Sequence, residues 1–348
     1  MVCIAAFIIL LIVSLSLPIL RIFNRELSQK IWKMLKKAWG CVGKKLTLRK
    51  CDTNFKEDVK NTLLARVVVA KPRLVKPISV GIEVVSVLIV VIFAWSVIEL
   101  VKSGLSLVAL GTCNVESPES CSLGAESCAI DGGKLNWFEE WGEIFAVLPT
   151  RFKNWSATEY ADKVEVALLN PRNAGQDFAG SVDFAKNAAL DIFDPGCIVC
   201  KKSYNAQLAD GFFDRHSVYL LPYPIVAADG EYKFANSEII SRYILASDGE
   251  MAWEIVDRLF TGFSENGRDW QDVFNTSLSR EEAGVTLQSW LSDFGLSSGE
   301  IAVVTERADS AEITMKMSVI KDVVDNDIRT RKIPTMIFDG KIHFGLYK

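Results

Sequence analysis

The stretch that decides the fold is Leu190–Tyr204, with the sequence LDIFDPGCIVCKKSY. An apolar run, Ala188 to Phe193, leads into it, and from Lys201 onward the chain is polar and compatible with a helix. Cys197 and Cys200 therefore lie where a strand gives way to a helix. A thiol at a helix N-terminus faces the positive end of the helix dipole, which favours the thiolate, and the second thiol lies about one turn away on the same face. Such a pair can cycle between dithiol and disulfide.

Two other interpretations of the cysteine pair are half of a zinc site and two ordinary core cysteines. A zinc site needs further ligands, and the sequence offers only His216 and His343 and no second CxxC. We therefore expect neither a metal nor a cofactor. The residues around the pair are therefore needed to distinguish a redox-active pair from two cysteines that only pack in the core.

Strands and helices alternate from about residue 181. The residue pattern predicts a strand at Ala188–Phe193, a helix at Cys197–Phe213 and a second strand at Ser217–Val226. This order is the beginning of a strand, helix, strand unit, which indicates an α/β fold.

A long helical region and a hairpin complete this part of the chain. Apolar residues recur at helical spacing over residues 233–327, which predicts amphipathic helices that cover one edge or face of the sheet. Two short strands follow, Ile333–Phe338 and Lys341–Phe344, joined by Asp339-Gly340. An Asp-Gly pair between two apolar runs is a strong hairpin signal.

Two of these segments together resemble the thioredoxin superfamily. The string LDIFDPGCIVCKKSY resembles the family's active-site strand, CxxC and helix, and residues 327–341, DIRTRKIPTMIFDGK, resemble its cis-proline strand and hairpin. The helical insertion makes residues 181–348 most similar to the DsbA-like branch. The resemblance implies a thioredoxin-like fold with a helical insertion and thiol–disulfide oxidoreductase activity.

The resemblance also implies roles for single residues. Cys197 would be the nucleophile that forms a mixed disulfide, and Cys200 would resolve it. Asp191 would be a buried acid that moves the proton to and from Cys200, unless it is a surface acid at the strand end. Pro334 would be a cis-proline that brings the backbone of Ile333 beside the cysteines to pair with an extended substrate; the alternative is an ordinary proline at a strand start.

The chain departs from the family's pattern in two places. Ile198-Val199 has neither the His of strongly oxidising members nor the Gly-Pro of cytosolic thioredoxins. Stabilisation of the thiolate would then depend on the helix dipole and on Lys201 or Lys202, which predicts a potential less oxidising than the DsbA extreme. The sequence also ends at Lys348 without the terminal helix of the family. Either helices before residue 180 cover that face of the sheet, or the sequence is truncated.

Two apolar runs near the start predict two transmembrane helices. Val2 to Leu20 is an uncharged run of 19 residues, and Ile78 to Val101 has 24 residues with only Glu83 and Glu99 as charges. Each run is long enough to cross a bilayer. The first run has no basic residues before its apolar core and no clear cleavage site, so we expect an uncleaved helix (residues 1–20) rather than a signal peptide.

The charge between the spans sets the predicted orientation. Residues 21–77 carry 16 Lys or Arg and 4 acidic residues, whereas residues 102–348 carry 23 basic and 37 acidic ones. The positive-inside rule puts the basic loop in the cytoplasm and both termini outside. The basic residues 30–37 have the pattern of an amphipathic helix that lies on anionic lipid. The alternative is that their charge only sets the topology. Nucleic-acid binding is a weaker interpretation, because no recognised nucleic-acid-binding module accompanies the basic residues.

The cysteines follow this topology. Cys41 and Cys51 are expected in the reducing cytoplasm, and the other cysteines after them lie in the exported part, where disulfides persist. The predicted stalk and helices at residues 102–180 contain three cysteines, Cys113, Cys121 and Cys128. We expect two of them to close a small loop and the third to be free, bound to a partner or paired with Cys3. Helices are predicted at residues 135–148 and 158–169.

The sequence thus predicts a membrane-anchored thiol–disulfide oxidoreductase that exchanges disulfides with exported proteins through the CxxC pair. The catalytic domain, residues 181–348, would lie outside a two-pass anchor in the cell membrane, with the second span at residues 78–101. Its partners would be exported substrates with cysteines, a membrane redox partner that recharges the CxxC, and membrane lipid. The alternative is a non-catalytic thioredoxin-like binding or scaffold protein of the cell envelope. Direction of transfer depends on the potential and on the recharging partner.

Overall fold

A computed structural model describes most of the second half of the chain and parts of the first. The described residues are 29, 32, 33, 36, 39, 73, 75–113, 126–130, 135–157, 159–160, 188–227 and 229–347. The chain divides into two compact units, Met1–Val101 and Lys102–Lys348, which are described separately.

The first unit contains most of a long helix, α5 (Val75–Leu110, 36 residues). Among the described residues it is the helix that is long and apolar enough to cross a membrane, with a mean hydropathy of 2.7 in its most apolar window. It includes the span predicted at residues 78–101 and extends beyond both of its ends. The other predicted span, residues 1–20, lies outside the described residues. In the basic loop, residues 29, 32, 33, 36 and 39 are helical and exposed, at the spacing of one helix.

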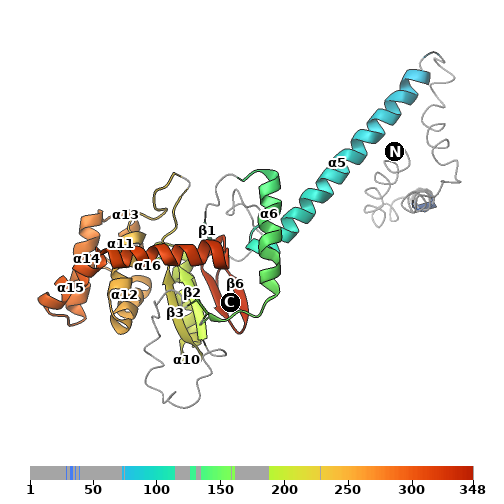
Figure 1. The fold of residues 1–348 in the computed structure, drawn as a ribbon. Coiled ribbons are helices and arrows are strands. Elements are labelled where there is room, and N and C mark those ends of the chain that lie inside the picture. Colours follow the sequence, from blue (N-terminus) through green and yellow to red (C-terminus); the bar gives the residue numbers. More distant parts are fainter. Residues whose placement is uncertain are drawn as a thin grey trace. The chain divides into compact units, whose positions relative to one another are not determined.

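The second unit is built around a four-stranded sheet (Figure 1). Its strand order is β3-β2-β5-β6, formed by β3 (Ser217–Pro222), β2 (Ala188–Phe193), β5 (Thr335–Phe338) and β6 (Lys341–Phe344). The central strand β2 runs parallel to β3 and antiparallel to β5, and every residue of it is buried, as its continuous apolar run predicts. The predicted α/β class is therefore correct.

The hairpin between β5 and β6 forms at the predicted dipeptide. Asp339 and Gly340 have φ values of 49° and 71°, so both central residues of the turn are left-handed. Two left-handed residues define the turn that matches the twist of a two-residue hairpin.

The helix after the cysteines is shorter than predicted. The sequence predicts one helix over Cys197–Phe213, but the structure has α9 (Ile198–Ala209) and then α10 (Phe212–Arg215). Gly211 separates them with a φ of 65°, a conformation that ends a right-handed helix and that glycine adopts without a steric penalty.

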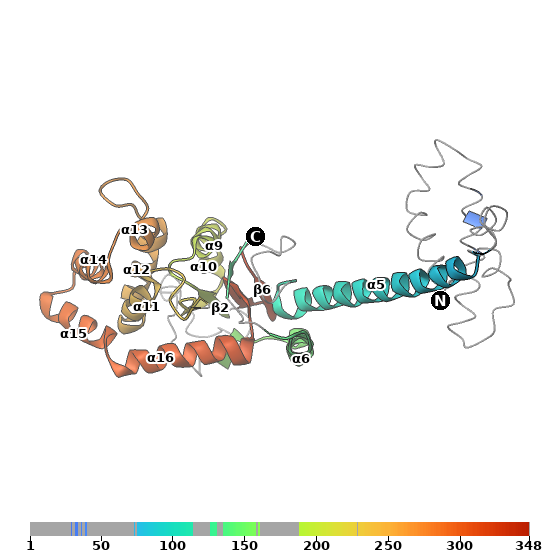
Figure 2. The same ribbon diagram turned by 90° about the horizontal axis from the view of Figure 1, so that it is seen from above.

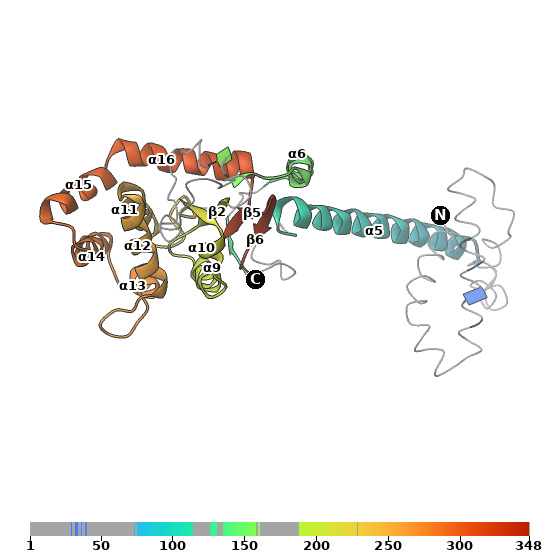
Figure 3. The ribbon, with the colours of Figure 1, turned by 90° about the horizontal axis from the view of Figure 1, so that it is seen from below.

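The predicted helical insertion is present between β3 and the last strands. It consists of α11 (Ser237–Ala246), α12 (Gly249–Thr261), α13 (Trp270–Thr276), α14 (Arg280–Asp293), α15 (Ser298–Ala308), α16 (Ala311–Asp322) and η5 (Val323–Ile328). Figure 2 and Figure 3 show α11–α15 gathered beyond one end of the sheet, with α16 running back toward it. In these views α9 and α10 lie on one side of the sheet and α16 on the other.

Segments before residue 160 also pack on the sheet. Helix α6 (Trp137–Val147) forms where residues 135–148 predict it and is followed by η3 (Leu148–Phe152). Beyond them the backbone N–H of Trp155 donates to the carbonyl of Gly340 (2.9 Å), and the Arg151 guanidinium lies 5.1 Å from the Phe344 ring centre. The β6 hairpin is therefore covered by chain that precedes residue 180. The predicted helix 158–169 lies almost entirely outside the described residues.

A second, two-stranded sheet joins this early segment to the strand before the hairpin. Strand β1 (Cys128–Ala129) pairs antiparallel with β4 (Lys332–Ile333). Helix α6 is tied to the same place, because Glu143 forms an ion pair with Arg331. The pairing of β1 with β4 brings Cys128 and Ile333, which are distant in the sequence, to the N-terminus of α9.

Candidate active site

The cysteine motif lies at the junction predicted from the sequence. Strand β2 ends at Phe193, and Cys197 is the N-cap residue of α9, with extended backbone angles (φ −77°, ψ 117°). The backbone N–H of Cys197 donates to the carbonyl of Asp194 (3.0 Å), which closes the turn between strand and helix. The Cys197 sulfur is therefore positioned at the positive end of the α9 dipole.

Cys197 is bonded to Cys128 and not to Cys200. The Cys128–Cys197 disulfide has a Cα–Cα separation of 6.3 Å and joins residues 69 positions apart, while the Cys200 thiol is free and buried. The sequence predicts a redox couple of Cys197 with Cys200 and leaves Cys128 to a loop with Cys113 or Cys121, a free thiol, a partner or Cys3, so the Cys128–Cys197 bond differs from each of these expectations. The physical reason is the pairing of β1 with β4, which no local pattern in the sequence reveals. Cys113 is also disulfide-bonded.

Residues 126–130 lie in an extended conformation against the strand before the hairpin. Cys128 is opposite Ile333 and Ala129 is opposite Lys332. The backbone N–H of Ile130 donates to the carbonyl of Arg331 (3.1 Å). On the other side, the N–H of Leu346 donates to the carbonyl of Glu126 (2.8 Å). The segment is thus held by main-chain hydrogen bonds at both of its ends.

Ile333 and Pro334 stand next to this segment. The Ile333–Pro334 peptide bond is cis, and Ile333 is fully buried. Ile333 is the residue that pairs with Cys128, so the disulfide and the cis bond flank the same backbone position.

Cys200 faces the protein interior. Its sulfur accepts a hydrogen bond from the backbone N–H of Asp194 (3.4 Å). Burial raises the pKa of the Cys200 thiol well above its ordinary value, and the nearby charges of Asp194 and Asp191 raise it further. Cys200 is therefore a protonated thiol at neutral pH, and it must lose its proton before it can act as a nucleophile.

Asp191 is a buried carboxylic acid near this thiol. It lies in the middle of β2, opposite Met336 and Leu220 in the neighbouring strands. Gln207 of α9 donates from its amide to one carboxylate oxygen (2.9 Å), and the other oxygen has no hydrogen-bond partner in the described part of the chain. Burial raises the pKa of Asp191 to about 6. A carboxyl group with such a pKa can take up and release a proton close to neutral pH.

Asp194 is a second buried acid, and the sequence analysis did not single it out. Its two carboxylate oxygens accept hydrogen bonds from the backbone N–H groups of Gly196 (2.7 Å) and Ile225 (2.7 Å) and from the Ser237 hydroxyl. Burial raises its pKa to about 6, against the lowering effect of these bonds. The Asp-Pro-Gly sequence before Cys197 was the available signal, since Asp commonly hydrogen-bonds backbone two residues on. Asp194 joins the cysteine turn to the segment after β3, through Ile225, and to α11, through Ser237.

The helical insertion supports the cysteine turn from α13. Gln271 donates from its amide to the carbonyls of Pro195 (2.7 Å) and Cys197 (3.0 Å). Asn275, one helical turn later, donates to the carbonyl of Gly196 (2.8 Å). A side chain at Gly196 would overlap Phe234 and Ser237, so the turn passes close to the insertion. The turn is therefore fixed by side chains from far along the sequence.

The two lysines after the motif each form an ion pair with a residue distant in the sequence. Lys201 forms an ion pair with Asp269 (3.2 Å), and Lys202 forms one with Glu126 (2.7 Å). The N-terminus of α9 is the other source of positive charge that the sequence predicts for the thiolate.

The histidines lie in an aromatic cluster. The ring of His216 stacks on Phe212 (4.2 Å between centres), and His343 stacks on Phe338 (4.1 Å). Among the described residues, no group of three His, Cys, Asp or Glu side chains could hold a metal ion.

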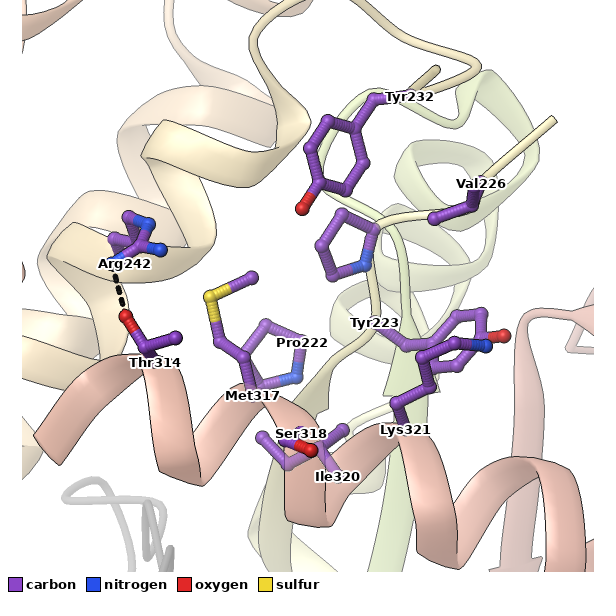
Figure 4. A pocket seen from close by; sticks show the side chains of 11 residues that line it. Pro222, Tyr223, Val226, Tyr232, Arg242, Thr314, Met317, Ser318, Ile320 and Lys321 are labelled. Atoms are coloured by element: carbon purple, nitrogen blue, oxygen red, sulfur yellow. Dashed lines mark hydrogen bonds between the residues drawn. The ribbon is translucent and has the colours of Figure 1, made fainter. Parts of the chain in front are cut away.

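A pocket lies beside the loop that follows β3 (Figure 4). It is lined by Tyr223, Tyr232 and Arg242 on one side and by residues of α16, including Met317, on the other. Arg242 donates to the Thr314 hydroxyl (3.2 Å) across it. The lining contains no cysteine and no carboxylate, so this pocket offers no thiol chemistry of its own.

No family model and no curated protein matches this chain. Among solved structures it is similar to a thioredoxin-like oxidoreductase from Silicibacter pomeroyi DSS-3, with 14% identity over 46% of this chain and 79% of that chain, and a TM-score of 0.32. It is also similar to the thiol-disulfide exchange protein alpha-DsbA2 from Wolbachia pipientis (14% identity, 55% of this chain and 91% of that chain, TM-score 0.34). An oxidized mutant of DsbA1 matches at 15% identity, 47% of this chain and 75% of that chain, with a TM-score of 0.29. With scores this low, conclusions about function rest on the residues of the site.

Proposed function

We propose that this chain is a membrane-anchored, extracytoplasmic thiol–disulfide oxidoreductase of the thioredoxin-like, DsbA-like type, with Cys197 as its nucleophile and Cys200 as the resolving thiol. One observation carries the proposal: Cys197, at the N-terminus of α9, is joined by a disulfide to an extended segment that pairs with Ile333, next to a cis Pro334. This arrangement has the form of a mixed disulfide between an enzyme and a bound peptide.

The exchange step follows from the two thiols and Asp191. Asp191 takes the proton of Cys200, and the Cys200 thiolate attacks the Cys197 sulfur. The Cys197–Cys200 bond forms as the bond between Cys197 and the substrate cysteine breaks. The substrate cysteine leaves with the electron pair and takes up a proton, so it is reduced as Cys200 is oxidised. In the oxidising direction, one thiolate of a substrate dithiol attacks Cys197 of the Cys197–Cys200 disulfide and Cys200 leaves as a thiol. The second substrate thiolate then attacks the substrate sulfur of this mixed disulfide, so a substrate disulfide forms and Cys197 leaves reduced. Whether the protein oxidises, reduces or isomerises depends on the membrane redox partner that recharges the pair.

Recognition of the substrate would use the backbone more than side chains. Ile333 lies next to the cis peptide bond and offers its main chain to an extended peptide, as β-strand addition does in other peptide-binding domains. Exported proteins with cysteines in extended segments are therefore the proposed substrates.

The membrane part of the proposal combines α5 with the charge pattern. Helix α5 supplies a span, and residues 1–20 would supply the other, with the basic loop 21–77 in the cytoplasm and against anionic lipid. The disulfide at Cys197 fits an oxidising compartment.

The burial of Cys197 favours a second candidate. With Cys128 bonded to it, the Cys197 side chain is 0% exposed, which also suits a non-catalytic thioredoxin-like scaffold in which the disulfide is structural. The two candidates differ in whether Cys197 exchanges disulfides with other molecules.

The full chain in detergent micelles provides the test. In a Cys128→Ser background, Cys200→Ser should accumulate mixed disulfides with exported proteins on non-reducing gels, and dithiothreitol should dissolve them. Cys197→Ser in the same background should form none and should lose oxidation of a dithiol peptide, while Cys51→Ser, in the predicted cytoplasmic loop, serves as the control. Exchange that persists without Cys197 would overturn the enzyme proposal.

A further inference from the structure

We infer that residues 126–130 are a tethered substrate of this site and that Cys128 is a third redox-active cysteine. The inference rests on the proposed function and adds to it an internal occupant of the backbone edge at residues 331–333. In the structure that occupant is already in place, bonded to Cys197 through the Cys128–Cys197 disulfide.

The backbone of the segment is bound as an external peptide would be. Cys128 and Ala129 pair in antiparallel register with Ile333 and Lys332. Hydrogen bonds from Ile130 to Arg331 and from Leu346 to Glu126 extend the contact at both ends. Such main-chain bonds do not depend on the side chains of the bound strand, so the same backbone edge can accept another chain in place of this one.

The side chains of the segment indicate which peptides fit. Ala129 is 1% exposed and Ile130 is 4% exposed, and Ile130 belongs to the main core cluster. Because Ala129 is buried, the position directly after the cysteine has room for only a small residue. Because Ile130 is buried in the core, the position after that favours an apolar residue. Glu126, two residues before the cysteine, pairs with Lys202 (2.7 Å). The favoured substrate would thus have a cysteine followed by a small and then an apolar residue, with an acidic residue two positions before it.

The exchange within the chain balances without any added oxidant or reductant. The Cys200 thiol gives its proton to Asp191, and its thiolate attacks the Cys197 sulfur. The Cys197–Cys200 bond forms, the Cys128–Cys197 bond breaks, and Cys128 leaves as a thiolate that takes up the proton. One disulfide and one thiol are present before and after the step, so Cys128 and the CxxC pair exchange a single disulfide among three sulfurs.

Tethering makes Cys128 a strong competitor of external substrates. Cys128 and Cys197 are 69 residues apart, but α6 and Trp155, which lie between them, are anchored at Arg331 and Gly340, so Cys128 meets Cys197 at an effective concentration on the order of millimolar. A substrate peptide at micromolar concentration has to displace the segment first. The segment therefore limits access to Cys197 and admits mainly partners that pair well with the backbone edge at residues 331–333.

Disulfide mapping of the unmodified full chain tests the pairing directly. After alkylation of free thiols, trypsin with a Glu-specific protease puts Cys128 in residues 127–134 (SCAIDGGK) and the CxxC in residues 187–201 (NAALDIFDPGCIVCK), with Cys113 and Cys121 in other peptides. In a fraction of the molecules, we expect these two peptides to be joined by the Cys128–Cys197 disulfide, with Cys200 alkylated. In the Cys200→Ser variant, nearly all molecules should contain this cross-link. A Cys197–Cys200 loop with Cys128 always alkylated or linked elsewhere would overturn the inference.

The rate of disulfide exchange with an external peptide provides a second test of the inference. Cys128→Ser should speed exchange with an external peptide by roughly tenfold or more. Ser127→Ala, a neighbour that keeps the thiol, should change the rate by less than about twofold. A peptide of sequence ESCAI should form a mixed disulfide with the Cys128→Ser protein more readily than one with arginine at the position of Ala129. Equal rates for Cys128→Ser and the unmodified chain would refute the tethered substrate and leave the enzyme proposal intact, since only loss of exchange on removing Cys197 bears on the latter.

Discussion

The two cysteines of the CIVC motif lie between two differently built regions. Around Cys200 is an acid side, made of Asp191, Asp194 and Gln207, which lie close together in the sequence on β2, the turn and α9. At Cys197 is a peptide side, made of residues 126–130 and 331–334, which come from distant parts of the chain. The acid side is polar and closed, whereas the peptide side consists mainly of backbone.

The acid side therefore serves proton transfer, and the peptide side determines which peptide binds at Cys197. Proton transfer needs a few groups at fixed distances, and adjacent elements of one strand–turn–helix unit can supply them. Peptide binding needs an open backbone edge, and such an edge is created only when the fold brings another strand to it. Changes on the acid side should therefore alter rates and their pH dependence, and changes on the peptide side should alter which partner occupies Cys197.

The strongest test of the acid side is Asp191→Asn. Asn cannot accept the Cys200 proton, so resolution of a mixed disulfide should slow by roughly 10- to 100-fold, and its pH profile should lose the step near pH 6. Rapid-quench kinetics of the Cys128–Cys197 bond, with alkylation of the released thiol, measure this rate. An unchanged rate and pH profile would remove Asp191 from the mechanism.

The same substitution should raise stability at neutral pH. Burial raises the pKa of Asp191 to about 6 from 3.8, so the folded chain binds the proton more tightly than the unfolded chain does. The stability that this group contributes is full below pH 3.8 and is lost as the pH rises through 6, a difference of roughly 3 kcal/mol above that range. Asn avoids that loss and can still accept from Gln207. Asp194→Asn is the matched comparison: burial raises its pKa to the same value, so it avoids the same loss, but it sets an amide against backbone donors at a cost of about 1–3 kcal/mol and should therefore raise stability less than Asp191→Asn does.

The turn that joins the two regions is tested by Gly196→Ala. A methyl group there would overlap Phe234 and Ser237, which should cost about 1–3 kcal/mol of unfolding free energy and displace Cys197. Gly142→Ala in α6 is the control, because nothing lies within 4 Å of the added methyl group and alanine favours a helix. Thermal unfolding followed by circular dichroism compares them. Equal melting temperatures would show that the turn has room to relax.

The contrast between the two regions also explains what the sequence could predict. Strand β2, the start of α9 and the Asp339-Gly340 hairpin follow local rules of apolar runs, helix starts and turn residues. The insertion was likewise evident from its helical spacing. The Cys128–Cys197 bond and the contacts of Gln271 and Asn275 were not, because they join residues whose proximity depends on the whole fold. The ion pairs of Lys201 with Asp269 and of Lys202 with Glu126 could not be predicted either, since these partners lie far away in the sequence.

The contribution of the insertion to the turn is tested by Gln271→Ala. Its amide donates to the carbonyls of Pro195 and Cys197, so its loss should cost about 1–2 kcal/mol and slow exchange several-fold by loosening the turn. Gln288→Ala removes the same side chain within the insertion, where it donates to the Tyr243 hydroxyl (3.2 Å) away from the cysteines. It should lower stability slightly without changing the exchange rate. Equal effects of the two variants on exchange would mean that α13 does not position the turn.

The smallest expected effect is that of Lys202→Ala on the peptide side. The Lys202 and Glu126 side chains are 52% and 60% exposed, so water and salt screen their ion pair and it is worth about 0.2–1 kcal/mol. The fraction of molecules with the Cys128–Cys197 bond, relative to the Cys197–Cys200 bond, should fall by less than about fivefold, and the loss should disappear at ~1 M salt. Asp293→Ala, which breaks the ion pair with Arg258 in the insertion (2.8 Å), is the control and should leave that fraction unchanged. Because main-chain bonds hold the segment, a much larger shift would mean that charge rather than backbone pairing selects the peptide.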